Sequence, residues 1–280
     1  MTAFASVLAD ARAVARLVTV PAQADLAYRA AVLIEMVGMV TEIALYAVVW
    51  RSLYGETGAG GTGWAGGSVA GIDRAGAVTY TTLGTLQYFA YYAPERQVGE
   101  ALRGGSISYV LLRPVGYLTQ LLAHDLGGFL WSLLAIAAGL ATAVAFSVAA
   151  LPASWGQFGL YGLSLLLAFL VQYHIRLLLA LTAFWTTEVW GVQAAFHFAT
   201  RILAGGIAPL WFFPDWFRSA AALLPFAGFA HAPLSIYIGR LTGPDAWAAI
   251  GLQVGWACAL ALAGAGLWRA AVRKLVIQGG

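Results

Sequence analysis

Long apolar stretches recur along the whole chain, and they constrain its fold more than any other feature. A helix needs about 20 mainly apolar residues to cross the hydrocarbon core of a bilayer. Six stretches come close to this length or exceed it. They cover residues 26–50, 75–93, 120–148, 157–184, 190–208 and 246–268. The sequence therefore predicts an all-α membrane protein with six transmembrane helices.

Charged residues are scarce, and their kinds exclude several functions. Only 10% of the 280 residues are charged, against about 25% in soluble domains, so residues 1–280 are predicted to form a single transmembrane domain. The only lysine is Lys274, and it follows no glycine-rich turn. Because a P-loop needs a lysine after such a turn to reach the nucleotide phosphates, we do not expect the chain to hydrolyse ATP by itself. The basic residues are scattered, so no nucleic-acid partner is expected.

The ends and loops carry an asymmetric charge that predicts orientation. Segment 1–25 contains Asp10, Arg12, Arg16 and Asp25, which make it too polar to span and favour an interfacial helix. Across six spans, nine lysine and arginine residues fall on the side of both termini and four on the other side. The positive-inside rule then predicts that both termini lie in the cytoplasm.

The predicted cytoplasmic loop 95–119 is unusually polar for this chain. Val98, Leu102 and Ile107 can form an apolar strip along a short helix, while charged residues on the other face are available to a partner. A partner-binding helix and an ordinary charged loop on lipid headgroups both agree with this pattern.

Segment 209–245 is apolar and aromatic but is interrupted repeatedly by proline. The prolines are Pro209, Pro214, Pro225, Pro233 and Pro244. Broken apolar backbone at membrane depth is tolerated only where protein surrounds it. We therefore expect a re-entrant helical segment between the fifth and sixth spans.

Several ionisable residues lie inside predicted spans. Placing such a residue in the membrane carries a large free-energy cost, so these residues mark candidate functional sites. Glu35 and Glu42 are seven residues apart and share one helix face. Helix rise puts Glu35, Arg176 and Arg201 at similar depths of roughly 14, 13 and 16 Å from the cytoplasmic side. We predict that Glu35 pairs with Arg176 or Arg201. The pair either fixes helix packing or takes part in binding and gating.

The remaining polar residues allow weaker expectations. His124 and Asp125, near the start of the third span, are expected at the membrane interface. The histidine spacing matches no metal motif, so no metal site is expected. Spans 75–93 and 190–208 carry threonines, glutamines and aromatic residues, which suit either a translocation surface or close helix packing.

Four motifs together resemble ABC-2 type permeases of the bacterial six-span branch. The loop motif comprises residues 99–105 and 111–115, and the second comprises 184–187 ahead of Gly191. The third comprises residues 205–214 with 224–226, and the fourth is the closing segment 276–280. Their order and spacing extend the match over most of the chain from residue 26 onward.

The resemblance implies the membrane part of an ATP-driven exporter in the bacterial plasma membrane, moving an amphipathic or hydrophobic compound that is drug-like or lipid-like. It implies a dimer with a second copy or a similar permease, and two ABC ATPase subunits that bind ATP and Mg. This chain would bind no cofactor of its own. Segment 95–119 would act as the coupling segment and 209–245 as an extracellular lid over the path.

Specific residues follow from the same resemblance. The expected ATPase-coupling residues are Glu95, Arg96, Gly99, Glu100, Arg103, Ile107, Leu111 and Arg113. The expected substrate-path residues are Tyr80, Gln87, Phe196 and Thr200.

Two other classes of membrane protein are alternatives to an ATP-driven exporter. A secondary transporter would favour repeated halves with helices broken at mid-membrane, and no convincing repeat relates 26–148 to 157–268. A membrane-embedded enzyme would need a nucleophile, metal or acid–base group, and the residues suggest none.

Overall fold

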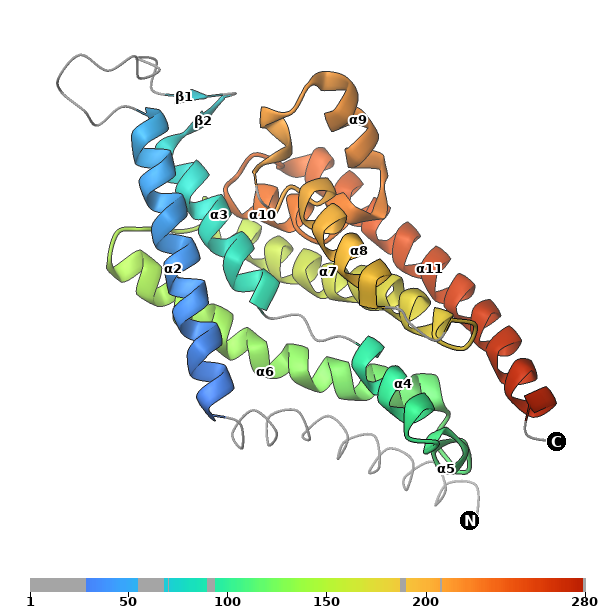
Figure 1. Ribbon diagram of the computed structural model, residues 1–280. Coiled ribbons are helices and arrows are strands. Elements are labelled where there is room, and N and C mark those ends of the chain that lie inside the picture. Colours follow the sequence, from blue (N-terminus) through green and yellow to red (C-terminus); the bar gives the residue numbers. More distant parts are fainter. Residues whose placement is uncertain are drawn as a thin grey trace, which may run out of the picture.

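The computed structural model describes residues 29–54, 68–69, 71–89, 94–186, 190–206 and 208–278. Helices make up nearly all of the regular structure in these residues (Figure 1). The N-terminal interfacial helix predicted for 1–25 lies outside these residues. The elements, in order, are α2 (Arg29–Tyr54), β1 (Ser68–Val69), β2 (Ile72–Asp73), α3 (Arg74–Phe89), α4 (Pro94–Arg103), α5 (Ile107–Leu111), α6 (Tyr117–Ala145), α7 (Trp155–Thr182), α8 (Trp190–Leu203), η1 (Leu210–Phe212), α9 (Asp215–Leu223), η2 (Pro225–Gly228), α10 (His231–Tyr237) and α11 (Gly243–Gln278). β1 and β2 form a short antiparallel pair.

All six predicted spans contain a helix, but only four of these helices are long and apolar enough to cross a membrane. These four are α2, α6, α7 and α11. α3 has 16 residues and α8 has 14, so they extend only about 24 and 21 Å, less than the hydrocarbon thickness of about 30 Å. Four full-length helices agree with the prediction, the bent pair Asp215–Leu223 and Pro225–Tyr237 is a fifth candidate within the described residues, and the number of six spans stays a prediction.

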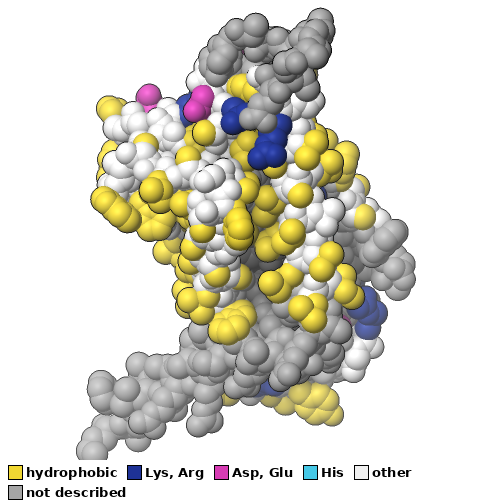
Figure 2. Space-filling view, turned by 90° about the vertical axis from the view of Figure 1, so that its left-hand side faces the viewer, with side chains coloured by type: hydrophobic (Ala, Val, Ile, Leu, Met, Phe, Trp, Pro, Cys, Tyr) yellow, Lys and Arg dark blue, Asp and Glu magenta, His cyan; other side chains and the backbone are white. Residues whose placement is uncertain are grey.

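α3 and α7 form the centre of the molecule. Tyr80 and Leu83 of α3 are fully buried, and α7 packs against α4, α10 and α11. The stacked rings of Phe129 in α6 and Phe169 in α7 lie 4.6 Å apart and join these two helices. α2 lies at the edge with most of its apolar side chains exposed, and Figure 2 shows the apolar surface on this side of the molecule. Such a surface suits contact with lipid or another membrane chain.

The proline-rich segment folds into four short helical pieces. Pro209 and Pro214 directly precede η1 and α9, Pro225 begins η2, and Pro233 and Pro244 lie in the first turns of α10 and α11. Proline is tolerated in a first turn because no helical partner exists for its missing N–H. The axes of Asp215–Leu223 and Pro225–Tyr237 differ by 75°. The helix break predicted for 209–245 is thus present, while its side of the membrane stays a prediction.

The two ends of the molecule differ in what they carry. α4, α5, the start of α2 and the end of α11 lie in the lower part of Figure 1, whereas β1, β2 and α9 lie in its upper part. The coupling segment 95–119, the start of α2 and the end of α11 therefore share one end of the helix bundle. This agrees with the grouping used to predict orientation, and the cytoplasmic assignment of that end stays a prediction.

Candidate functional site

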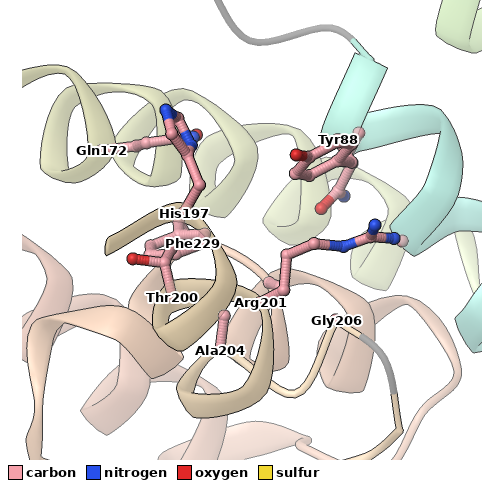
Figure 3. Close-up of a pocket in the computed structure, with 11 residues that line it drawn as sticks. Tyr88, Gln172, His197, Thr200, Arg201, Ala204, Gly206 and Phe229 are labelled. Atoms are coloured by element: carbon pink, nitrogen blue, oxygen red, sulfur yellow. The ribbon is translucent and has the colours of Figure 1, made fainter. Parts of the chain in front are cut away.

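A small pocket lined by several polar side chains lies where α3, α7 and α8 meet the turn between η2 and α10. Its volume is about 30 Å³, and Gln87, Tyr88, Gln172, Thr200 and Arg201 are among the residues that line it. Figure 3 shows that these side chains come from different helices. A polar space of this size is sufficient for a water molecule and far smaller than the 300–1,000 Å³ of typical ligand pockets.

Three buried polar atoms of the pocket-lining residues have no hydrogen-bond partner within the described part of the chain. They are Gln87 Oε1, Gln172 Oε1 and Thr200 Oγ1. Gln87 is held in place because its Nε2 donates to the hydroxyl of Tyr161 at 3.0 Å. An unpartnered buried acceptor costs about 1–3 kcal/mol. The residues around the pocket thus retain hydrogen-bonding capacity that the described part of the chain does not use.

An ion pair lies beside this pocket and joins α8 to α2. Arg201 donates to the carboxylate of Glu42, and both side chains are about a quarter exposed. The Arg201 guanidinium also lies 4.3 Å from the centre of the Tyr88 ring. The Tyr46 hydroxyl adds a hydrogen bond to Glu42. The arginine is thus held by a carboxylate and an aromatic face.

The acidic partner of Arg201 is Glu42, while the pairing of Glu35 with Arg176 or Arg201 stays a prediction. Because α2 begins at Arg29, Glu35 lies only about 9 Å along the helix and Glu42 about 20 Å, whereas Arg201 lies about 16 Å along α8. Glu42 is therefore nearer in depth. The Glu35 side chain lies outside the described residues.

The other predicted arginine, Arg176, contacts α8 through a histidine. Its Nη2 lies 3.0 Å from Nε2 of His197, a pocket-lining residue. α7 is therefore tied to α8 directly beside the pocket.

Two of the four predicted substrate-path residues line the pocket and two do not. Gln87 and Thr200 line it. The hydroxyl of Tyr80 lies 3.3 Å from His231 Nδ1, and its ring packs edge-on against Trp211. Phe196 packs against a ring of the broken segment. Tyr80 and Phe196 therefore act in packing here, because their faces of α3 and α8 turn toward the broken segment.

Sequence reasoning missed Tyr88 and Gln172 as pocket residues. Tyr88 directly follows Gln87 in the polar series of its span. Gln172 is a polar residue inside an otherwise apolar helix, which was an available signal. Their meeting depends on how α3 and α7 pack, and no local pattern encodes that packing.

The predicted coupling segment folds into α4 and α5, connected by a short turn. Val98 and Ala101 are buried where α4 packs on α6 and α7, and Glu100 and Arg103 lie on the exposed face. This confirms the amphipathic helix that the sequence predicted. The side chains of Glu95 and Arg96 lie outside the described residues.

The surface that the coupling segment presents differs from the prediction. Gly99 and Ile107 are buried against the protein's own helices, so they support the segment and are not available to a partner. Leu111 is exposed, and Arg113 donates from Nη1 to Gln120 Oε1 at 3.0 Å. Within the coupling segment, the most exposed apolar side chains are Tyr109 and Leu112, at 75% and 83%. Sequence reasoning missed both, because the α5 face they occupy depends on how Ile107 packs.

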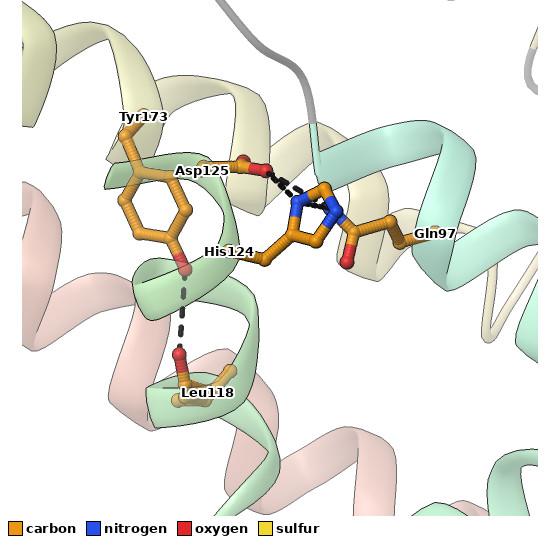
Figure 4. Close-up of polar contacts among 5 residues, drawn as sticks. All are labelled: Gln97, Leu118, His124, Asp125 and Tyr173. Atoms are coloured by element: carbon orange, nitrogen blue, oxygen red, sulfur yellow. Dashed lines mark hydrogen bonds and ion pairs between the residues drawn. The ribbon is translucent and has the colours of Figure 1, made fainter. Parts of the chain in front are cut away.

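A buried polar cluster connects α4 to α6. Gln97 Nε2 donates to Asp125 Oδ1 at 2.9 Å and lies 2.9 Å from His124 Nδ1 (Figure 4). The second carboxylate oxygen of Asp125 has no hydrogen-bond partner among the described residues. Nearby, the Tyr173 hydroxyl donates to the Leu118 carbonyl. Asp125 is fully buried because α4 covers this part of α6, and its position at the depth of the membrane interface stays a prediction.

Comparison with known families gives one match. The family model described as "ABC-2 family transporter protein" matches residues 63–279. No curated protein and no solved structure matches the chain. The matched region includes the pocket-lining residues of α3, α7 and α8, the coupling segment and the broken segment, but not α2.

Proposed function

Because the chain belongs to the ABC-2 transporter family and is a permease of an ABC transporter, we propose that it forms the path of an exporter driven by two separate ABC ATPase subunits. The ATPases would bind ATP and Mg, and this chain would bind no cofactor. It would work in the bacterial plasma membrane as a dimer with a second copy or a similar permease. Family membership favours this proposal over a secondary transporter or a membrane-embedded enzyme.

The observation that carries the proposal is the arrangement of α4 and α5. Their inner faces are buried on α6 and α7, while Tyr109 and Leu112 are among the most exposed large apolar side chains of the described chain. Glu100 and Arg103 add exposed charges beside them. Large apolar side chains surrounded by polar residues are typical of contact sites for another protein. We assign this surface to ATPase docking.

The same arrangement supports a route from the ATPase to the pocket. α4 packs on α7, and α7 contributes Gln172 to the pocket and connects to His197 of α8 through Arg176. The Gln97–Asp125 hydrogen bond ties α4 to α6 as well. A displacement of α4 would therefore move the helices that enclose the pocket.

The pocket would be the closed form of the substrate path. At about 30 Å³ it cannot admit a drug-sized compound, so transport requires α3, α7 and α8 to separate. The acceptors of Gln87, Gln172 and Thr200 favour an amphipathic compound with a hydroxyl or amide N–H group.

The docking assignment is tested by co-purification with the ATPase. The double variant Tyr109→Ala/Leu112→Ala should weaken ATPase binding by about tenfold or more, since truncation of an interface anchor costs at least about 1–2 kcal/mol. Leu151→Ala is a matched control, because Leu151 is 71% exposed but lies in the α6–α7 connection. Unchanged ATPase binding by the double variant would contradict the docking surface.

The energy source is tested in proteoliposomes that contain the permease and its ATPase. Transport should stop when the P-loop lysine of the ATPase is replaced, and it should continue when the proton gradient is dissipated. The opposite pair of results would favour the secondary transporter and would exclude an ATP-driven exporter.

A further inference from the structure

An apolar cavity separate from the polar pocket lies under the broken segment. Its volume is about 280 Å³, and it is enclosed by α9, η2, α10, the first turns of α11 and one residue of α7. In Figure 1, α9 and α10 lie close to the beginning of α11. Alanines supply much of its wall, including Ala227 and Ala249, so the space exists because small side chains face one another.

The polar side chains in the cavity wall, those of His231, Gln253 and Trp256, contact other residues of the protein. His231 Nδ1 lies 3.3 Å from the Tyr80 hydroxyl. Gln253 donates from Nε2 to the carbonyls of Ser164, at 3.0 Å, and Gly228, and its Oε1 accepts from the Ser164 hydroxyl at 2.9 Å. Trp256 donates from Nε1 to the Leu223 carbonyl at 3.0 Å. The cavity therefore presents mainly apolar surface. Cavities of this kind exclude water and accept apolar molecules.

The cavity borders an exposed apolar surface of the bundle. Leu224 and Leu252 line it and are more than one-third exposed, and Leu223 and Trp247 extend the exposed apolar surface on both helices. α11 is one of the four helices long and apolar enough to span a membrane. The cavity is thus continuous with a lipid-facing surface of the bundle.

Size and chemistry identify the occupant. An apolar cavity of about 150 Å³ accepts benzene, so 280 Å³ accommodates a longer hydrocarbon. Side chains in protein interiors normally leave few such spaces. We propose that this α9–α11 cavity binds one acyl chain of a membrane phospholipid, which fills the space between the broken segment and α11. The site requires only that the chain resides in a bilayer, and it is independent of ATPase docking and of transport.

The test counts phospholipid molecules retained by the purified full-length protein. The wild-type protein and two substitutions on α11 are incorporated into bilayers of phosphatidylethanolamine and phosphatidylglycerol, transferred to detergent and examined by native mass spectrometry. Ala249→Phe fills the cavity with a benzene-sized ring. Ala259→Phe introduces the same ring at an exposed position of α11 that does not line the cavity.

We expect a single retained phospholipid on the wild-type protein and on Ala259→Phe, and at least a tenfold loss of this species for Ala249→Phe. Ala249→Leu fills less of the cavity, so it should lose an intermediate amount of the retained phospholipid. It replaces Ala249→Phe as the test variant if Ala249→Phe does not fold. Added phosphatidylglycerol should raise the melting temperature of the wild type but not that of Ala249→Phe. Equal retention by Ala249→Phe and the wild type would overturn the assignment. So would a folded wild type that retains no lipid, or one that retains a different apolar molecule in its place.

Discussion

The ion pair between Glu42 and Arg201 should stabilise the attachment of α2 to the bundle. α2 has few buried residues, so this contact is prominent among those that hold it. We propose the variants Glu42→Ala and Arg201→Ala and their combination as a double-mutant cycle, which isolates the interaction between the two side chains.

The size of the effect follows from the exposure of the pair. An exposed ion pair contributes about 0.2–1 kcal/mol, and breaking a fully buried pair costs about 3–5 kcal/mol. The Arg201 and Glu42 side chains are 27% and 21% exposed, so we expect Glu42→Ala to cost about 2–3 kcal/mol. Arg201→Ala also loses the contact with the Tyr88 ring, which is worth about 0.5–2 kcal/mol. The coupling energy should be about 2 kcal/mol, or roughly a thirtyfold change in the folded-to-unfolded ratio.

The assay is reversible unfolding by a denaturing detergent in bicelles, followed for the wild type, both single variants and the double variant. The chain offers a matched control in Asp215 and Arg218 of α9, whose charged atoms lie 2.7 Å apart but whose side chains are 88% and 42% exposed. That pair should couple by no more than about 1 kcal/mol. The reasoning is refuted if the Glu42–Arg201 coupling is no larger than the Asp215–Arg218 coupling.

Three further substitutions test other features of the fold. Gln97→Leu removes the hydrogen bond to the buried carboxylate of Asp125, so the ATPase should still bind while more ATP is hydrolysed per molecule transported in proteoliposomes; an unchanged ratio would exclude a coupling role for Gln97. Gly205→Ala should lower stability by about 1–3 kcal/mol, because Gly205 has φ +70° and an added Cβ would lie 3.0 Å from the Tyr80 hydroxyl. Gly162→Ala, at a position of α7 where an added Cβ would meet open space, should raise stability by up to about 1 kcal/mol. Thermal denaturation in which Gly205→Ala and Gly162→Ala shift the melting temperature in the same direction would contradict these expectations.

The coupling segment illustrates how far sequence reasoning extends into the site. The spacing of Val98 and Leu102 predicts an amphipathic α4, because helical periodicity is a local property. Which side chains of the next turn face outward depends on the surface beneath it. Ile107 turns inward onto the bundle, and Tyr109 and Leu112 are left exposed. The sequence therefore predicted the segment but not its outer surface.

The intramembrane charges were likewise predictable from the sequence as a kind of contact, but not in the identity of both partners. The sequence indicated that a carboxylate on the first span meets an arginine on a later span, because an unpaired charge in the membrane is costly. It named Glu35, whose side chain lies outside the described residues, and the contact that the structure shows for Arg201 is with Glu42. Depth counted from span boundaries did not decide between the two glutamates, because apolar composition defines those boundaries only approximately.

By itself, the sequence determined that this protein is a helical membrane protein of the ABC-2 transporter family, since hydropathy, proline position and motif order are all properties of the linear chain. Only the tertiary structure decided which polar residues share a pocket and where cavities remain. Gln87, Gln172 and Thr200 are far apart in sequence and meet because α3, α7 and α8 pack together. The α9–α11 cavity likewise exists because alanines of separate helices face one another. Helix packing depends on the shapes of whole surfaces, and no local pattern of residues specifies it.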